Sequence, residues 1–123
     1  MLFKGCGINI VTPFTDTNEV DFDSLGRLVD TYINIGAKAL ILGRTTGEFF
    51  AMSDNEILEV VDFVVKRADK RLPVLAQTGL NDTSRSVVLS IRARALGLDG
   101  LIIASPYYSQ GNELGLISHF KSI

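Results

Sequence analysis

The sequence predicts an α/β fold in which short parallel strands alternate with helices. Four short apolar runs are each followed by a segment whose apolar residues recur at helical spacing, which is the order that β-α units produce. The runs are continuously apolar rather than alternating, as in residues 39–42 (A-L-I-L) and 100–104 (G-L-I-I-A). Such runs are typical of parallel strands that are buried on both faces. We therefore expect a parallel sheet that is covered on both of its faces.

Length, charge and composition favour one soluble domain. The chain has 123 residues, of which 46% are apolar, and a formal charge of −2. No basic cluster indicates a nucleic-acid partner, and no apolar run approaches the ~18 residues of a membrane span. The opening residues lack the apolar core of a signal peptide, and the single Cys6 fits a reducing compartment. We expect a cytoplasmic protein with no nucleic-acid or membrane partner.

The first two β-α units have clear boundaries. A strand is expected over residues 7–11, and the helix after it has Asp21 as its N-cap and Gly36 as a left-handed stop. The second strand covers residues 39–42. A capping box over residues 53–56 (S-D-N-E) starts the second helix.

The third and fourth units follow the same plan. A buried strand is expected over residues 73–76, and Asp82 or Thr83 caps the next helix, which Gly97 ends. The apolar positions expected to face inward on that helix are Val87, Val88, Ile91 and Ala95. Strand four covers residues 100–104. A last helix carries an apolar stripe of Leu116, Phe120 and Ile123.

Two architectures fit four such units. One is a flavodoxin-like sandwich, and the other is half of a (β/α)₈ TIM barrel, whose complete form needs about 250 residues. No G-x-G-x-x-G or Walker loop follows any strand, whereas hydroxyl groups at the strand ends suit the mouth of a barrel. The preferred interpretation is that residues 1–123 form the amino-terminal half of one (β/α)₈ barrel domain.

Hydroxyl side chains gather where the predicted strands end: they are Thr12, Thr45, Thr46, Thr78, Tyr107 and Tyr108. The carboxyl ends of parallel strands share one edge of the sheet, so these side chains would form a ring beside the turn N–H groups. A hydroxyl both donates and accepts, so the ring suits binding a carboxylate or relaying a proton. Taken singly, Thr12 and Thr78 also fit roles in capping and turns.

Other chemistry-bearing residues form no recognisable constellation. Glu48 is either a general acid or base or a residue that holds its loop by accepting N–H bonds. No His, Cys or acidic cluster has the spacing of metal ligands, so no metal site is expected. The thiol of Cys6 is far in sequence from His119, and it is expected to pack as a small apolar side chain.

Five motifs occur in one order along the whole chain: I-V-T-P-F (10–14), T-T-G-E (45–48), P-V-L-A-Q-T-G (73–79), S-P-Y-Y (105–108) and H-F-K (119–121). Together they resemble the pyruvate-dependent, Schiff-base class I aldolases, the family that contains dihydrodipicolinate synthase and N-acetylneuraminate lyase. The paired threonines and paired tyrosines resemble the synthase more than the lyase.

The resemblance implies a lyase that condenses pyruvate with aspartate semialdehyde in lysine biosynthesis, with no organic cofactor. It implies that Thr45 passes a proton between tyrosines, and that Tyr108 belongs to the same relay and crosses a subunit interface beside Tyr107. Thr46 and the turn N–H groups, including that of Gly47, would hold the pyruvate carboxylate, and Thr12 is a further substrate-binding candidate. Members are commonly homotetramers.

Three departures from the family pattern matter. Arg44 replaces the glycine of the usual G-T-T-G-E, where it would recruit another carboxylate or obstruct the site. Phe49 and Arg85 replace a small residue and an acid that serve lysine feedback in related enzymes, so lysine is not expected to inhibit. A Schiff-base lysine belongs at the carboxyl end of a strand, and none of these five lies there: Lys4, Lys38, Lys66, Lys70 and Lys121. The chain alone is therefore predicted to be inactive.

Two other functions fit the same residues. One is a sister pyruvate aldolase or lyase that acts on N-acetylneuraminate or a 2-keto-3-deoxy sugar acid. The other is a non-catalytic half-barrel that serves as an interaction module. As half of a synthase-like barrel, the chain would expose two sheet edges, so we expect it to associate with the missing carboxyl-terminal half or with a second copy.

Overall fold

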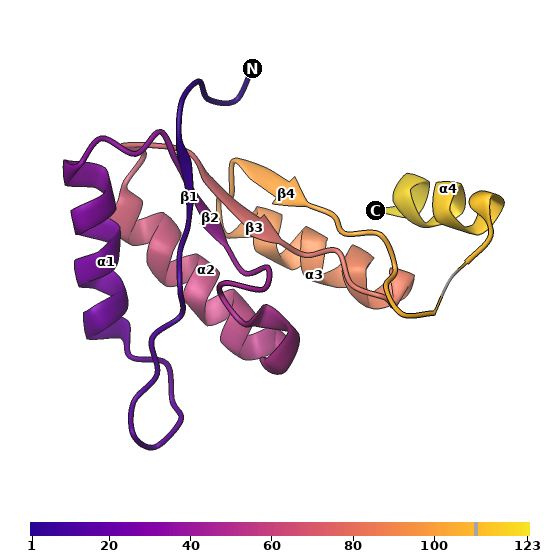
Figure 1. Ribbon diagram of the computed structural model, residues 1–123, viewed down its shortest axis with the longest axis horizontal. Helices are drawn as coiled ribbons and strands as arrows, with labels where there is room; N and C mark the ends of the chain where they lie inside the picture. The colour runs from indigo at the N-terminus through magenta and orange to yellow at the C-terminus, as the bar shows by residue number, and fades with distance from the viewer. Residues whose placement is uncertain (110) are drawn as a thin grey trace.

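The computed structural model describes residues 1–109 and 111–123 (Figure 1). The elements in chain order are β1 (Gly7–Asn9), α1 (Phe22–Asn34), β2 (Ala39–Leu42), the 3-10 helix η1 (Phe49–Ala51), α2 (Asp54–Ala68), β3 (Val74–Gln77), α3 (Thr83–Ala95), β4 (Gly100–Ile102) and α4 (Glu113–Ser122). All four predicted β-α units are present, and η1 is the element that the sequence did not predict. In the described ranges no helix is both long and apolar enough to cross a lipid bilayer.

The four strands form one parallel sheet in the order β1-β2-β3-β4. Neighbouring strands pair in a regular register, with Leu40 opposite Val74 and Leu75 opposite Gly100. Figure 1 shows α1, α2 and α3 along one face of this sheet. In a flavodoxin-like sandwich the strand order reverses, whereas a (β/α)₈ barrel adds each strand beside the previous one. The sheet is thus half of a (β/α)₈ barrel.

The core lies between the sheet and these helices. Strand residues on the helix-covered face are buried, and they include Leu40, Leu42, Val74 and Ala76. On the other face Asn9 is exposed, and its cross-strand neighbours Ile41 and Leu75 are half-buried. Within the described residues, helices cover one face of the sheet only, so the expectation that both faces are covered is not met by these residues alone. In a barrel this second face is turned toward the barrel axis.

The predicted helix starts are confirmed. The side chain of Asp21 accepts a hydrogen bond from Ser24 N at 2.9 Å, and that of Asp82, rather than Thr83, accepts one from Arg85 N at 2.9 Å. Ser53 forms both bonds of a capping box with its partner three residues on. Because these side chains satisfy N–H groups that have no partner within the helix, they fix where each helix begins.

The predicted inner face of α3 is wrong. Val88 and Ile91 are 55% and 64% exposed, Ala95 is exposed and Val87 is half-buried. The buried residues are instead Ser86, Leu89, Ser90 and Ala93. Two of these carry hydroxyls that have buried partners: Ser86 Oγ accepts from Leu80 N at 2.8 Å, and Ser90 Oγ donates to Thr78 Oγ1 at 2.7 Å. Small hydroxyl residues with such partners can face a core as readily as apolar ones.

The predicted apolar stripe of α4 is also not its buried face. Phe120 is 47% exposed, while Leu116 and Ile123 are half-buried. The buried residue is His119, whose Nδ1 is 2.8 Å from Thr83 Oγ1. This hydrogen bond joins α4 to the first turn of α3, the helix against which α4 mainly packs.

Candidate active site

The T-T-G-E segment forms a tight loop between β2 and η1. The N–H of Gly47 donates to the carbonyl of Gly43 at 2.8 Å. A Cβ on Gly47 would lie 2.8–2.9 Å from the N, O and Cα atoms of Gly43, so only glycine allows this closure. Gly43 and Arg44 both have left-handed backbones, with φ values of 82° and 57°. The loop therefore has one compact conformation, in which residues 44–46 form the tip.

Thr12 ties this loop to the end of β1. Its side chain is 6% exposed, and its Oγ1 donates to the carbonyl of Gly47 at 2.7 Å. The structure thus brings together two of the predicted site residues that are 35 positions apart in the chain. The hydroxyl of Thr12 holds the loop, and it does not line the pocket described next.

A pocket of about 310 Å³ opens beside this loop, at the carboxyl ends of β2, β3 and β4. Its lining residues are Arg44, Thr45, Phe50, Gln77, Ile102, Ile103, Ala104 and Ser105. Thr45 is thus the predicted catalytic residue that the structure places at the pocket, while Thr46 is exposed next to it. No lysine is among these lining residues.

The predicted ring of hydroxyls is smaller than expected. Thr78 is fully buried, and its Oγ1 accepts a hydrogen bond from Ser90 on α3, so it supports the sheet from the helix side. Two polar residues of the pocket, Gln77 and Ser105, were not predicted. Both are the kind of residue that could have been found, because each follows directly on an apolar strand run in the quoted motifs.

The two tyrosines lie on the loop after β4 but not in the pocket lining. The N–H of Tyr107 donates to Asn81 Oδ1 at 2.6 Å, and its ring meets that of Phe50 edge-on with centroids 5.2 Å apart. Tyr108 has a φ of 66° and a fully exposed side chain (101%). Tyr108 is therefore not among the residues that line the pocket with Thr45, and the role of this tyrosine stays a prediction.

An ion pair joins the starts of α2 and α3. Arg85 Nε and Nη2 donate to the same oxygen, Asp54 Oδ1, at 2.9 and 2.6 Å. This hydrogen bonding to Asp54 raises the pKa of Arg85 above its ordinary value. Arg85 lies in the first turn of α3, which follows β3, and Asp54 lies in the first turn of α2, which follows the loop and η1.

Comparison with known proteins identifies the family of this chain. A sequence profile of the Dihydrodipicolinate synthetase family matches residues 2–123. The chain belongs to this family. The 4-hydroxy-tetrahydrodipicolinate synthase of Caldicellulosiruptor bescii is 48% identical over 122 residues, which are 99% of this chain and 41% of that protein. The chain thus spans about two fifths of the length of the curated relatives that it matches.

Solved structures of Dihydrodipicolinate synthetase family members have the same fold over this length. The dihydrodipicolinate synthase of Aquifex aeolicus superposes with a TM-score of 0.94 at 38% identity, covering 98% of this chain and 41% of that one. YagE, a prophage protein of the same family from E. coli K12 that was solved in complex with pyruvate, gives 0.95 at 30% identity and covers 100% and 43%.

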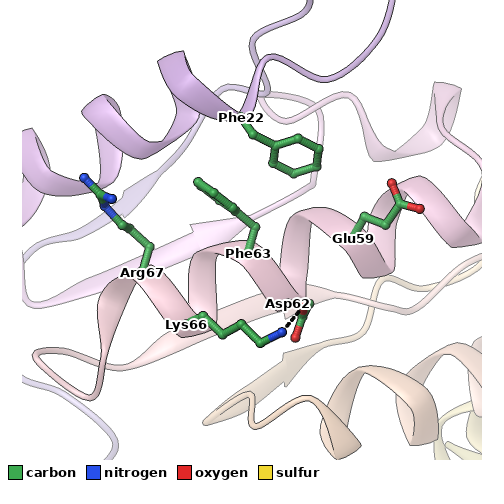
Figure 2. Close-up of a pocket in the computed structure, with 6 residues that line it drawn as sticks. All are labelled: Phe22, Glu59, Asp62, Phe63, Lys66 and Arg67. Carbon is green, nitrogen blue, oxygen red and sulfur yellow. Dashed lines mark hydrogen bonds and ion pairs between the residues drawn. The ribbon is translucent and has the colours of Figure 1, made fainter.

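A second hollow lies elsewhere, on the outer surface between α1 and α2. It has about 650 Å³ and is lined by Phe22, Glu59, Asp62, Phe63, Lys66 and Arg67. Figure 2 shows the rings of Phe22 and Phe63 next to each other, tilted by 52° with centroids 5.0 Å apart, and charged side chains on either side of them. It contains no hydroxyl or turn N–H site and lies away from the strand ends, so the smaller pocket remains the candidate active site.

Proposed function

We propose that residues 1–123 form the amino-terminal half of the barrel of a cytoplasmic lyase that condenses pyruvate with aspartate semialdehyde in lysine biosynthesis. The observation that supports this most directly is the position of Thr45 in a pocket at the carboxyl ends of three parallel strands. In barrels of this kind the reacting groups come from that edge of the sheet. Membership of the Dihydrodipicolinate synthetase family gives the reaction type.

The tight loop is suited to binding the carboxylate of pyruvate. The N–H of Gly47 already donates to Gly43 O, so this glycine would act by closing the loop rather than by donating to substrate. The backbone N–H groups of Thr45 and Thr46, together with the hydroxyl of Thr46, would hold the carboxylate. The hydroxyl of Thr45 then remains available to pass a proton, because it can donate and accept at once.

The nucleophile would come from the part of the barrel outside this chain. A Schiff base needs an amine at the pocket, and the lining residues of the described chain include no lysine. We therefore propose that residues 1–123 alone are inactive. The reaction at the amine forms a C=N bond and releases water, and borohydride reduces that bond to a stable adduct.

Borohydride trapping in the presence of pyruvate tests this proposal. By mass spectrometry, the full-length protein should gain one reduced pyruvate adduct, and the 123-residue chain should gain none. An adduct on the short chain would show that one of its own lysines reacts. No adduct on the full-length protein would contradict a Schiff-base mechanism.

The half-barrel would also associate. Strands β1 and β4 each pair on one side only, and they leave the other side of their backbones open. The exposed Tyr108 fits the proposed interface with a second copy, as expected of a homotetramer in the full enzyme. Sedimentation of the 123-residue chain should show self-association or binding to the remaining half. A monodisperse monomer in both experiments would contradict this.

A second candidate is a sister pyruvate aldolase that takes another aldehyde. Arg44 favours it, because this residue lines the pocket where the family pattern has a glycine. A panel of aldehydes offered with pyruvate separates the two: a preference for aspartate semialdehyde supports the synthase, and a preference for a sugar-derived aldehyde supports the sister enzyme. Pyruvate binding by the full-length protein without an adduct would favour a non-catalytic module.

A further inference from the structure

We propose that Arg44 binds an oxyanion on the aldehyde substrate and so selects aldehydes that carry a carboxylate or a phosphate. This inference rests on the proposed function, since it assumes that the aldehyde meets pyruvate in the pocket at the strand ends. It adds a residue that determines specificity for the second substrate.

The backbone at Arg44 argues that its side chain has a purpose. Its φ of 57° lies in the left-handed region, where glycine fits without strain and a residue with a Cβ is disfavoured. The hydrogen bond from Gly47 N to Gly43 O closes the loop around it, so the backbone at this position is not free to relax. An arginine is therefore kept where glycine would be the easier residue. Strain of this kind is characteristic of functional loops.

The side chain lies where a substrate would be. Arg44 lines the pocket beside Thr45 and Gln77, and it is the one charged residue among the described lining residues. The other lining side chains include apolar ones, Phe50, Ile102 and Ile103, which suit a short carbon chain. A guanidinium at one edge of such a pocket would attract and orient an anionic group.

The charge of Arg44 is also uncompensated in the described part of the chain. Arg67 and Arg71 both pair with Asp30, and Arg85 pairs with Asp54. Within residues 1–109 and 111–123, Arg44 forms no ion pair and no side-chain hydrogen bond. Its donors are thus free to bind a ligand.

The proposed function assigns that anion to the aldehyde rather than to pyruvate. Under the proposed function, the pyruvate carboxylate takes the N–H groups of Thr45 and Thr46 at the tip of the loop. A second anion in the same pocket would belong to the other substrate. Arginine binds carboxylate and phosphate with the same two-pronged geometry, so both groups fit this position.

Three substitutions in the full-length protein test the inference. Arg44→Gly and Arg44→Asn both suit a left-handed backbone and remove the charge, while Arg44→Lys keeps the charge but loses the planar fork. Each is assayed with pyruvate and two matched pairs of aldehydes: succinic semialdehyde against butanal, and glyceraldehyde 3-phosphate against glyceraldehyde. The two pairs distinguish a carboxylate from a phosphate.

For the preferred anionic aldehyde, Arg44→Gly and Arg44→Asn should lower kcat/KM by about 10- to 100-fold, the range for losing a charge-assisted hydrogen-bonded pair. Their kcat/KM for the uncharged aldehyde and their KM for pyruvate should be unchanged. The kcat/KM of Arg44→Lys for the anionic aldehyde should lie between that of the wild type and that of Arg44→Gly. An equal loss for charged and uncharged aldehydes would overturn the inference, as would a rise confined to the KM for pyruvate.

A binding measurement separates this inference from the proposed function. Succinate, an unreactive dicarboxylate, is titrated calorimetrically into the full-length wild-type protein and the Arg44→Gly variant. Weaker binding of succinate by the variant supports the role of Arg44. This holds even if borohydride traps no pyruvate adduct, because a missing adduct contradicts only the proposed function. Equal binding by both proteins, or no binding by either, would overturn the inference about Arg44.

Discussion

Gly43 should tolerate alanine much less well than Gly36, although the two glycines have nearly the same backbone. Their φ values are 82° and 89°, both in the left-handed region. A Cβ on Gly43 would lie 2.4 Å from Cδ2 of Phe49, whose ring is 2% exposed in the core. A Cβ on Gly36 would meet no atom within 4 Å. Comparing Gly36→Ala with Gly43→Ala therefore separates the energetic cost of the backbone conformation from that of steric overlap with the Phe49 ring.

The expected magnitudes follow from these two terms. For Gly36→Ala, left-handed strain of about 1–2 kcal/mol is partly offset by the smaller loss of backbone entropy, which leaves a destabilisation of about 1 kcal/mol. For Gly43→Ala, forcing a methyl group against a packed ring adds about 1–3 kcal/mol. The free energy of unfolding should then fall by about 2–4 kcal/mol in total for that variant.

Urea unfolding of the full-length protein, followed by circular dichroism, measures both variants. Combining Gly43→Ala with Phe49→Ala completes a double-mutant cycle, and the coupling energy should recover most of the overlap term. If Gly43→Ala and Gly36→Ala cost the same, or if the cycle shows no coupling, the ring of Phe49 does not confine the loop and the steric reasoning fails.

Three further predictions follow from individual contacts. Thr12→Val removes the 2.7 Å bond to the loop carbonyl and should raise the KM for pyruvate, while Thr12→Ser should not; equal values for both variants would contradict a loop-holding hydroxyl. The hydrogen bond from Arg67 holds the pKa of Asp30 below its ordinary 3.8. The Asp30 carboxylate therefore stabilises the folded state above that value and loses this effect as the pH falls through the lowered pKa. Asp30→Asn should thus lower the urea midpoint at neutral pH, and the difference should shrink in acid; a difference independent of pH would exclude this linkage. Phe49 and Arg85 stand where the resemblance implies a small residue and an acid that serve lysine feedback, so lysine should not inhibit the full-length protein, and inhibition by sub-millimolar lysine would contradict this.

The fold was predictable because its signals are local. Each helix start is determined by a few neighbouring residues, because the capping side chain accepts a hydrogen bond from an N–H group of its own helix. The capping residues are Asp21, Ser53 and Asp82. Gly36 and Gly97 likewise have the left-handed backbones that their positions after α1 and α3 suggested. Family membership, too, was visible in the order of five short motifs.

The errors came from contacts between distant residues. The inner face of α3 was assigned to apolar residues, but Ser86 and Ser90 face the core because Leu80 and Thr78 satisfy their hydroxyls. A pattern of polar and apolar residues counts serine as polar, and it contains no information on hydrogen-bond partners that lie elsewhere in the chain. The same holds for the site, where the bond between Thr12 and the loop depends on the packing of β1 beside β2.

The order of strands in the sheet has a consequence for how the chain folds. Each strand hydrogen-bonds to the one that directly precedes it, so every ladder joins segments that are only one β-α unit apart. The entropic cost of closing a loop rises with its length, so each ladder closes over the shortest connection that a parallel pair allows. The free side of β4 is then the place where the next strand of a barrel would pair.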